Sequence, residues 1–217
     1  MGAEAKMSGR PKLLAGADLP PEPRQKRSKT TRARLKKAGL GQFGERGYEA
    51  SSVETIAKRA RLAVGTFYQH FHSKRELLLV LMDELIEKLS QLNLRPSGET
   101  NKDVRAGLRE LLRGAFAQDL LYLGAYRAWQ EAMLGDPELA RKNEEIHAWT
   151  TGRITAVFEA LLKMPGARPE VDASGLARVM DSFFWSLLGR AGKMRPAEIE
   201  RTINAATHLI YHGLFVR

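Results

Sequence analysis

The residues best suited to chemistry in this sequence lie in a short segment, residues 64–71. At helical spacing, Phe67 and Phe71 point the same way and are expected to face inward. Tyr68 and Gln69 lie on the other side and are expected to face outward. A glutamine amide on an outer helix face can pair with both polar atoms of an adenine edge in the major groove. The chemistry predicted for this segment is recognition of DNA by hydrogen bonds.

Two short helices joined by a tight turn must position that segment. Ser51 is a natural N-cap, and Glu54 three residues later completes a capping box. Apolar residues then recur at helical spacing up to Ala60, and residues 61–63 predict a break. A helix, a short turn and a second helix with a polar, aromatic outer face is typical of the helix-turn-helix, whose second helix enters the major groove.

The segment GTFYQHF, followed by Ser73-Lys74, resembles the recognition helix and next helix start of the TetR family. The upstream segment FGERGYEASSVETIAKRA is similar to the end of the first helix, the turn and the second helix of that family. The resemblance covers roughly residues 31–78. It departs from the family pattern at Arg61, where glycine is frequent, and at Ala63, where a polar cap is frequent.

The resemblance implies an all-α, homodimeric transcription regulator with DNA-contacting residues in the helix-turn-helix. Phosphate contacts are implied for Ser52, Thr66, Tyr68, His70 and Lys74. Base contacts are implied for Val64, Gly65 and Gln69, with Tyr68 shared between both tasks.

The distribution of charge agrees with a DNA-binding head. The chain of 217 residues has a formal net charge of +10. Its first 75 residues carry 17 Lys+Arg and 6 Asp+Glu, a net of +11, whereas the remainder carries 18 and 19, a net of −1. The basic excess therefore accompanies the helix-turn-helix, as expected of a polyanion-binding head on a neutral body.

Residues 1–27 mix glycine, proline and charge without any period and predict a flexible basic arm. A basic run that includes Lys26, Arg27 and Lys29 leads from this arm into the first long helix. Two interpretations stay open for the arm. It is either a solvated tail or a segment that follows phosphates or enters a minor groove.

Catalytic and metal-dependent chemistry is not predicted. The chain has no cysteine, and His208 and His212 lack the further ligands that zinc requires. The GxGxxG pattern at residues 39–44 falls inside a helical segment instead of following a strand, so it does not indicate dinucleotide binding. No nucleophile elbow or P-loop occurs. We expect no enzyme activity, no cofactor and no metal.

The sequence predicts neither a membrane span nor a signal peptide. No apolar run approaches the ~18–20 residues of a membrane span. The N-terminus lacks the continuous apolar core of a signal peptide. We expect a cytoplasmic protein without a membrane partner.

Helical periodicity continues to the end of the chain without strand-like alternation, so about nine helices are expected. Beyond the two short helices, the predicted segments are 28–46, 76–93, 104–117, 119–134, 138–163, 172–190 and 197–214.

The middle helices hold aromatic and soft side chains that suit an apolar ligand pocket. Ordinary core packing is the alternative for most of them. The candidate effector-binding residues are Phe116, Tyr122, Tyr126, Trp129, Met133, Trp149 and Phe184.

The last two helices are apolar over so much of their circumference that they must be covered on more than one side. Pairing them with their copies in a second chain would form a four-helix bundle, whereas burial within one chain is the alternative. The resemblance favours the dimer. The candidate interface residues are Val179, Phe183, Leu187, Ile203 and Ile210.

Together these observations predict three parts: a flexible basic arm (1–27), a three-helix DNA-binding head (28–75), and a helical body for effector binding and dimerisation (76–217). The predicted function is sequence-specific transcription regulation, with a repressor released from a palindromic operator on double-stranded DNA by a small, largely apolar ligand. The alternatives are a non-specific architectural DNA-binding protein and, less favoured, a helical enzyme acting on a small molecule.

Overall fold

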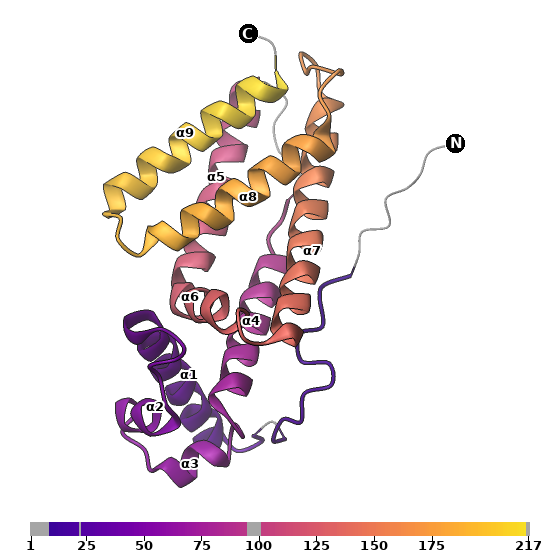
Figure 1. Ribbon diagram of the computed structural model, residues 1–217. Coiled ribbons are helices and arrows are strands. Elements are labelled where there is room, and N and C mark those ends of the chain that lie inside the picture. Colours follow the sequence, from indigo (N-terminus) through magenta and orange to yellow (C-terminus); the bar gives the residue numbers. More distant parts are fainter. Residues whose placement is uncertain (1–8, 22, 95–100, 216–217) are drawn as a thin grey trace. The chain divides into compact units, whose positions relative to one another are not determined.

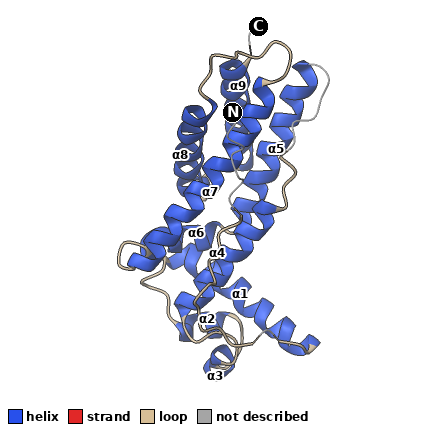
Figure 2. Cartoon of the chain, turned by 90° about the vertical axis from the view of Figure 1, so that its right-hand side faces the viewer, coloured by secondary structure: helices blue, strands red, loops and turns tan. Residues whose placement is uncertain are grey.

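The computed structural model describes residues 9–21, 23–94 and 101–215, with side chains from residue 104 in the last stretch. All elements in these ranges are helices, as the sequence predicts (Figures 1 and 2). They are α1 (Lys26–Arg46), α2 (Val53–Arg59), α3 (Val64–Tyr68), α4 (Lys74–Ser90), α5 (Asn101–Leu121), α6 (Leu123–Ala132), α7 (Pro137–Leu162), α8 (Ala173–Ala191) and α9 (Pro196–Leu214).

The predicted helix boundaries hold where glycine or proline interrupts the chain and shift elsewhere. α1 ends where predicted, since Gly47 has φ 78°, a conformation that favours glycine. The break expected near residue 118 lies instead between Leu121 and Leu123. α3 ends at Tyr68 and not at residue 71, so the recognition helix is a short one.

The chain forms two compact units that interleave along the sequence. Among the described residues, one contains 11–21, 23–87 and 121–143, and the other contains 9–10, 88–94, 101–120 and 144–215. The helix-turn-helix therefore shares its unit with α6 and the start of α7. The predicted division after residue 75 does not follow these units, because helix periodicity carries no information about which distant helix completes a core.

The N-terminal arm differs from the prediction. Leu13 has no exposed surface, and His72 Nδ1 donates to the Asp18 carbonyl oxygen at 2.9 Å. The buried ammonium of Lys142 also donates to the Ala15 carbonyl oxygen at 3.4 Å. The described arm residues 11–21 are therefore packed against the unit that carries the helix-turn-helix, and a fully flexible arm is wrong for them. The prediction for residues 1–8 lies outside the described residues.

In that unit, α1 packs closely against α6. A Cβ atom added at Gly124 would collide with the Leu40 carbonyl oxygen, so glycine is required for this approach of two backbones. Gly39, Gly41 and Gly44, which produce the GxGxxG pattern, all lie inside α1. The pattern thus belongs to a helix, as its sequence context indicates, and Gly44 faces the same crossing.

The other unit has its core between α5, α7, α8 and α9. Fully buried side chains from each helix meet there, among them Leu112, Phe158, Ala177 and Ile203. No helix within the described residues is long and apolar enough to cross a membrane.

Candidate nucleic-acid interface and ligand cavity

The outer face of α3 is exposed, as expected for a recognition helix. Val64 and Tyr68 are 36% and 47% exposed, although apolar and aromatic side chains are usually buried. Gly65 and Gln69 are exposed beside them. Thr66 is half-buried. This face offers an amide, a phenol and a bare backbone to a ligand.

The inner face of the same segment anchors it to the core. Phe67 and Phe71 are fully buried, with ring centroids 5.6 Å apart. The Arg32 guanidinium lies 4.3 Å from the centre of the Phe71 ring and donates to the His70 carbonyl oxygen at 2.6 Å. α1 therefore holds the C-terminal end of the recognition segment.

His70 does not lie where the sequence interpretation placed it. Its side chain is only 5% exposed, and burial, helped by the nearby Arg32 charge, lowers its pKa. In this position the imidazole offers little surface to a phosphate, and the phosphate contact of His70 stays a prediction. Helical spacing could not decide it, because α3 ends before residue 70.

Lys74 is also engaged inside the protein. Its Nζ donates to the carbonyl oxygens of Tyr48 and Ser51 at 2.9 and 3.0 Å, and it lies 4.2 Å from the centre of the Tyr48 ring. The ammonium thus fastens the α1–α2 connection to the start of α4. This structural role adds to the predicted phosphate contact of Lys74, which stays a prediction.

The N-cap of α2 is shifted by one residue from the prediction. Ser52, and not Ser51, accepts a hydrogen bond from the backbone N–H of Thr55, and Thr55 completes the capping box. Ser51 is buried and donates to the Gly47 carbonyl oxygen at 2.6 Å. Ser52 is half-buried at the start of α2, where a phosphate contact stays a prediction.

The turn between α2 and α3 contains Arg61, which has φ 54° and is the one non-glycine residue with positive φ in the described part of the chain. It occupies the position where the sequence departs from the family pattern of glycine. Arg34 Nη2 donates to the Ala60 carbonyl oxygen at 2.6 Å and thereby clamps this turn from α1. The turn keeps its geometry without glycine, at the cost of local backbone strain.

We expect Arg61→Gly to raise the free energy of unfolding by about 0.5–1 kcal/mol, since relief of left-handed strain exceeds the extra entropy of unfolded glycine. Urea denaturation of the two proteins measures the difference. Lys58→Gly, inside α2, is the matched control and should lose about 0.5–1 kcal/mol. Equal losses in both variants would contradict strain at Arg61.

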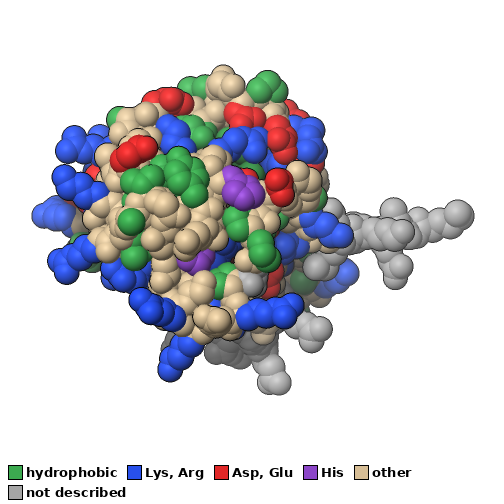
Figure 3. All heavy atoms as spheres, turned by 90° about the horizontal axis from the view of Figure 1, so that it is seen from below, with side chains coloured by type: hydrophobic (Ala, Val, Ile, Leu, Met, Phe, Trp, Pro, Cys, Tyr) green, Lys and Arg blue, Asp and Glu red, His purple; other side chains and the backbone are tan. Residues whose placement is uncertain are grey.

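Several basic side chains are available at the surface of this unit. Arg32 and Lys36 are not among them, because both make internal contacts. Arg32 donates to the His70 carbonyl oxygen, and Lys36 forms an ion pair with Glu84. Figure 3 views the molecule from the side of α3 and shows blue Lys and Arg side chains along the margin of that face. The exposed basic residues of α1 and α2 include Lys26, Arg27, Lys29, Lys37 and Lys58. Of these, the sequence analysis singled out the first three and missed Lys37 and Lys58.

The second candidate site is a cavity of about 140 Å³ in the unit without the helix-turn-helix. Its wall is formed by the end of α4 and by α5, α7, α8 and α9. Of the seven predicted effector residues, Phe116, Trp149 and Phe184 line it. The sequence analysis missed the polar residues of the wall, among them Asp119 and Arg153.

The other four predicted effector residues belong to the other compact unit and do not line this cavity, so the cavity does not support their assignment. Trp129 is fully buried there and donates from Nε1 to Asn143 Oδ1 at 3.1 Å. Tyr122 donates to Glu84 at 3.4 Å, and burial raises the pKa of Tyr122 to about 12. The remaining two are Tyr126, which is buried, and Met133, which is half-buried.

Comparison with known proteins decides the family. The family described as bacterial regulatory proteins, tetR family, matches residues 35–81. The HTH-type transcriptional regulator BetI of Stenotrophomonas maltophilia is 30% identical over 175 residues, which cover 79% of this chain and 88% of that relative. The chain belongs to the TetR family.

Other relatives agree with this assignment. The HTH-type transcriptional activator FasR of Mycolicibacterium smegmatis is 34% identical over 177 residues, 79% of this chain and 77% of the relative. A solved TetR-family regulator from Pseudomonas syringae has a TM-score of 0.61 at 25% identity and covers 86% of this chain and 97% of its own. KstR2 of Mycobacterium tuberculosis, a ketosteroid transcriptional regulator, shares the fold with a TM-score of 0.61 at 19% identity, covering 86% and 95%. The present TetR-family chain is thus a DNA-binding transcriptional regulator.

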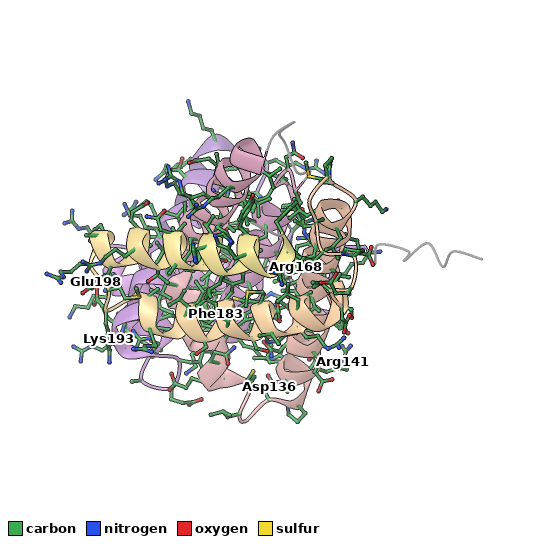
Figure 4. All side chains as sticks on the ribbon, turned by 90° about the horizontal axis from the view of Figure 1, so that it is seen from above. Asp136, Arg141, Arg168, Phe183, Lys193 and Glu198 are labelled. Atoms are coloured by element: carbon green, nitrogen blue, oxygen red, sulfur yellow. The ribbon has the colours of Figure 1, made fainter. Side chains whose placement is uncertain are left out.

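In this TetR-family regulator, α8 and α9 lie side by side and run in opposite directions (Figures 1 and 4). Val179 and Phe183, one turn apart on α8, are 61% and 38% exposed, and Leu209 on α9 is 60% exposed. These large apolar side chains provide an uncovered face.

Two of the five predicted interface residues are corrected. Ile203 and Ile210 are 1% and 2% exposed in the core of their own chain, where a second chain could not contact them. Leu187 is half-buried and packs against the same core. Val179 and Phe183 retain the exposure that an interface requires.

Proposed function

We propose that this regulator is a homodimeric repressor, joined through α8 and α9, that leaves a palindromic operator when a small ligand occupies the cavity. The support for ligand control is the cavity itself, enclosed by four long helices of the unit that lacks the helix-turn-helix. Apolar cavities with a few polar groups are the usual sites for small ligands. The support for the dimer is the exposed pair Val179 and Phe183.

Operator recognition follows from the exposed outer face of α3. In a two-fold dimer each head contacts one half-site, so the preferred DNA should be palindromic with half-sites about one or two helical turns apart. Selection from a random DNA pool with the full-length protein tests this. Enrichment of a palindrome supports the proposal, whereas equal binding of all sequences would favour the architectural alternative.

We expect Gln69→Ala to relax preference at one base pair in each half-site by about 1–3 kcal/mol, because the exposed amide can pair bidentately with an adenine edge. Titration of selected and scrambled DNA at several salt concentrations measures it, and the salt dependence should stay nearly unchanged. Lys29→Ala, exposed on α1, is the contrasting variant. It should weaken both DNAs alike and reduce the log–log salt slope by about one per head. Identical behaviour of the two variants would contradict base recognition by Gln69.

A further inference from the structure

The cavity wall is mostly aromatic and aliphatic. Phe116 and Phe184 meet edge to face, with ring centroids 5.9 Å apart, and Trp149, Phe158 and Trp185 also line the cavity. Aromatic rings have a negative face and a positive edge, so they attract a cation placed over the ring. A small ligand with one aromatic ring suits a cavity of about 140 Å³.

Two of the three charged residues in the wall already have partners. Asp181 accepts hydrogen bonds from Thr150 Oγ1 at 2.6 Å and Trp185 Nε1 at 3.1 Å, and it contacts His147 Nδ1 at 2.7 Å. This carboxylate is 5% exposed and fully committed to joining α7 with α8.

Arg153 is likewise engaged. Its Nη2 donates to the carbonyl oxygens of Leu89 and Leu92 at 3.0 and 3.3 Å, at the C-terminal end of α4. The guanidinium also lies 4.9 Å from the centre of the Trp149 ring. Helix C-termini carry partial negative charge, which offsets the positive charge of this side chain.

Asp119 is the exception. It occupies an apolar stripe of α5 with Leu112 and Phe116, and its carboxyl group has no hydrogen bond or ion pair with any described residue. Burial alone raises the pKa of Asp119 to about 7. By surface area Asp119 is half-buried, so water or a ligand supplies the partner that the apolar wall lacks.

We propose that the ligand of this cavity is a compact organic cation, an amine or quaternary ammonium with an apolar body, whose charge lies at Asp119 and whose body contacts the aromatic wall. This inference adds the chemical class of the ligand to the proposed function. It rests on that function for the role of the ligand as effector. A carboxylate ligand is disfavoured because Arg153, the one cation of the wall among the described residues, is held by helix carbonyl oxygens. A neutral ligand with an O–H or N–H group would donate a hydrogen bond to Asp119 but would leave the charge of its ionised form unpaired.

Because Asp119 exists in a protonated and an ionised form, the pH dependence of ligand affinity reports the charge of the ligand. In protein free of ligand, a carboxyl group whose pKa is raised by folding favours the folded state at low pH, and this contribution is lost as pH rises through about 7. A bound cation favours the ionised form, so its affinity should fall by about twentyfold from pH 7.5 to 5.5. Asp181 and Arg153 are the other charged groups of the wall, and each has a protein partner. His147 lies behind the wall, in contact with Asp181.

The test uses full-length protein and three probes of similar size: phenyltrimethylammonium, its neutral isostere tert-butylbenzene, and benzoate. Binding is followed by calorimetry and by fluorescence, since Trp149 and Trp185 line the cavity. We expect the cation to bind best, and Asp119→Asn to weaken it at least tenfold while leaving tert-butylbenzene within about twofold. Glu159→Gln, an exposed carboxylate on α7, is the control and should change nothing.

Preference for benzoate or tert-butylbenzene, or equal cation affinity in the wild type and Asp119→Asn, would overturn the inference. Should Asp119→Asn fail to fold, the pH series on the wild type decides, because the quaternary probe does not titrate. Cation affinity that is flat or increases toward pH 5.5 would also overturn it. The binding assays contain no DNA, so failure of operator selection affects only the proposed function, and failure of cation binding affects only the ligand class.

Discussion

Phe183→Asp should convert the regulator to a folded monomer and weaken binding to a palindromic operator by about 100-fold or more, because two linked heads are replaced by one. Phe183 is 38% exposed and Val179 is 61% exposed one turn away, so the substitution leaves the fold of the single chain intact. In the proposed dimer, however, it would bury a carboxylate in an apolar interface, which costs several kcal/mol or forces the group neutral. Sedimentation at micromolar concentration gives the oligomeric state.

Two further variants sharpen this experiment. Leu134→Asp changes an apolar residue that is 84% exposed outside α8 and α9, and it should stay dimeric. Ile210→Asp, with 2% exposure in the core of its own chain, should unfold and not merely dissociate. A wild-type monomer, or a Phe183→Asp variant that sediments like wild type, would show that this face is not the interface.

Trp129→Ala should lower the free energy of unfolding by about 3–5 kcal/mol. The side chain has no exposed surface, and truncation also leaves Asn143 Oδ1 without its hydrogen bond from the indole. Urea denaturation measures the loss. Tyr68→Ala removes an aromatic side chain that is 47% exposed, and its stability should stay within about 0.5 kcal/mol of wild type.

Trp129→Ala, compared with Trp149→Ala, also separates the roles of two tryptophans that the sequence analysis both assigned to effector binding. Trp149 lines the cavity and Trp129 does not, so only Trp149→Ala should reduce affinity for a cavity ligand once the proteins are compared at equal folded fraction. A Trp129→Ala protein that is as stable as wild type and has lost ligand binding would restore the original prediction.

The helix-turn-helix, the family and the all-helical fold follow from the sequence because they depend on local rules. Helical spacing alone decides that Phe67 faces inward and Gln69 outward, and Gly47 ends α1 through its own φ of 78°. The concentration of basic residues in the first 75 positions likewise needs no fold to be counted. Each of these features is set within a few turns of chain.

Tertiary structure alone decided which apolar faces meet each other. Periodicity shows that Trp129, Trp149 and Ile210 lie on apolar faces, but it cannot tell a core from a cavity or an interface, since all three require the same side chains. The same limit applied to polar residues. Asp119, His70 and Lys74 all carry polar side chains, yet the first lines a cavity, the second is buried, and the third binds carbonyl oxygens more than twenty residues away. Contacts between residues distant in sequence have no local signature, so only the packed chain assigns these roles.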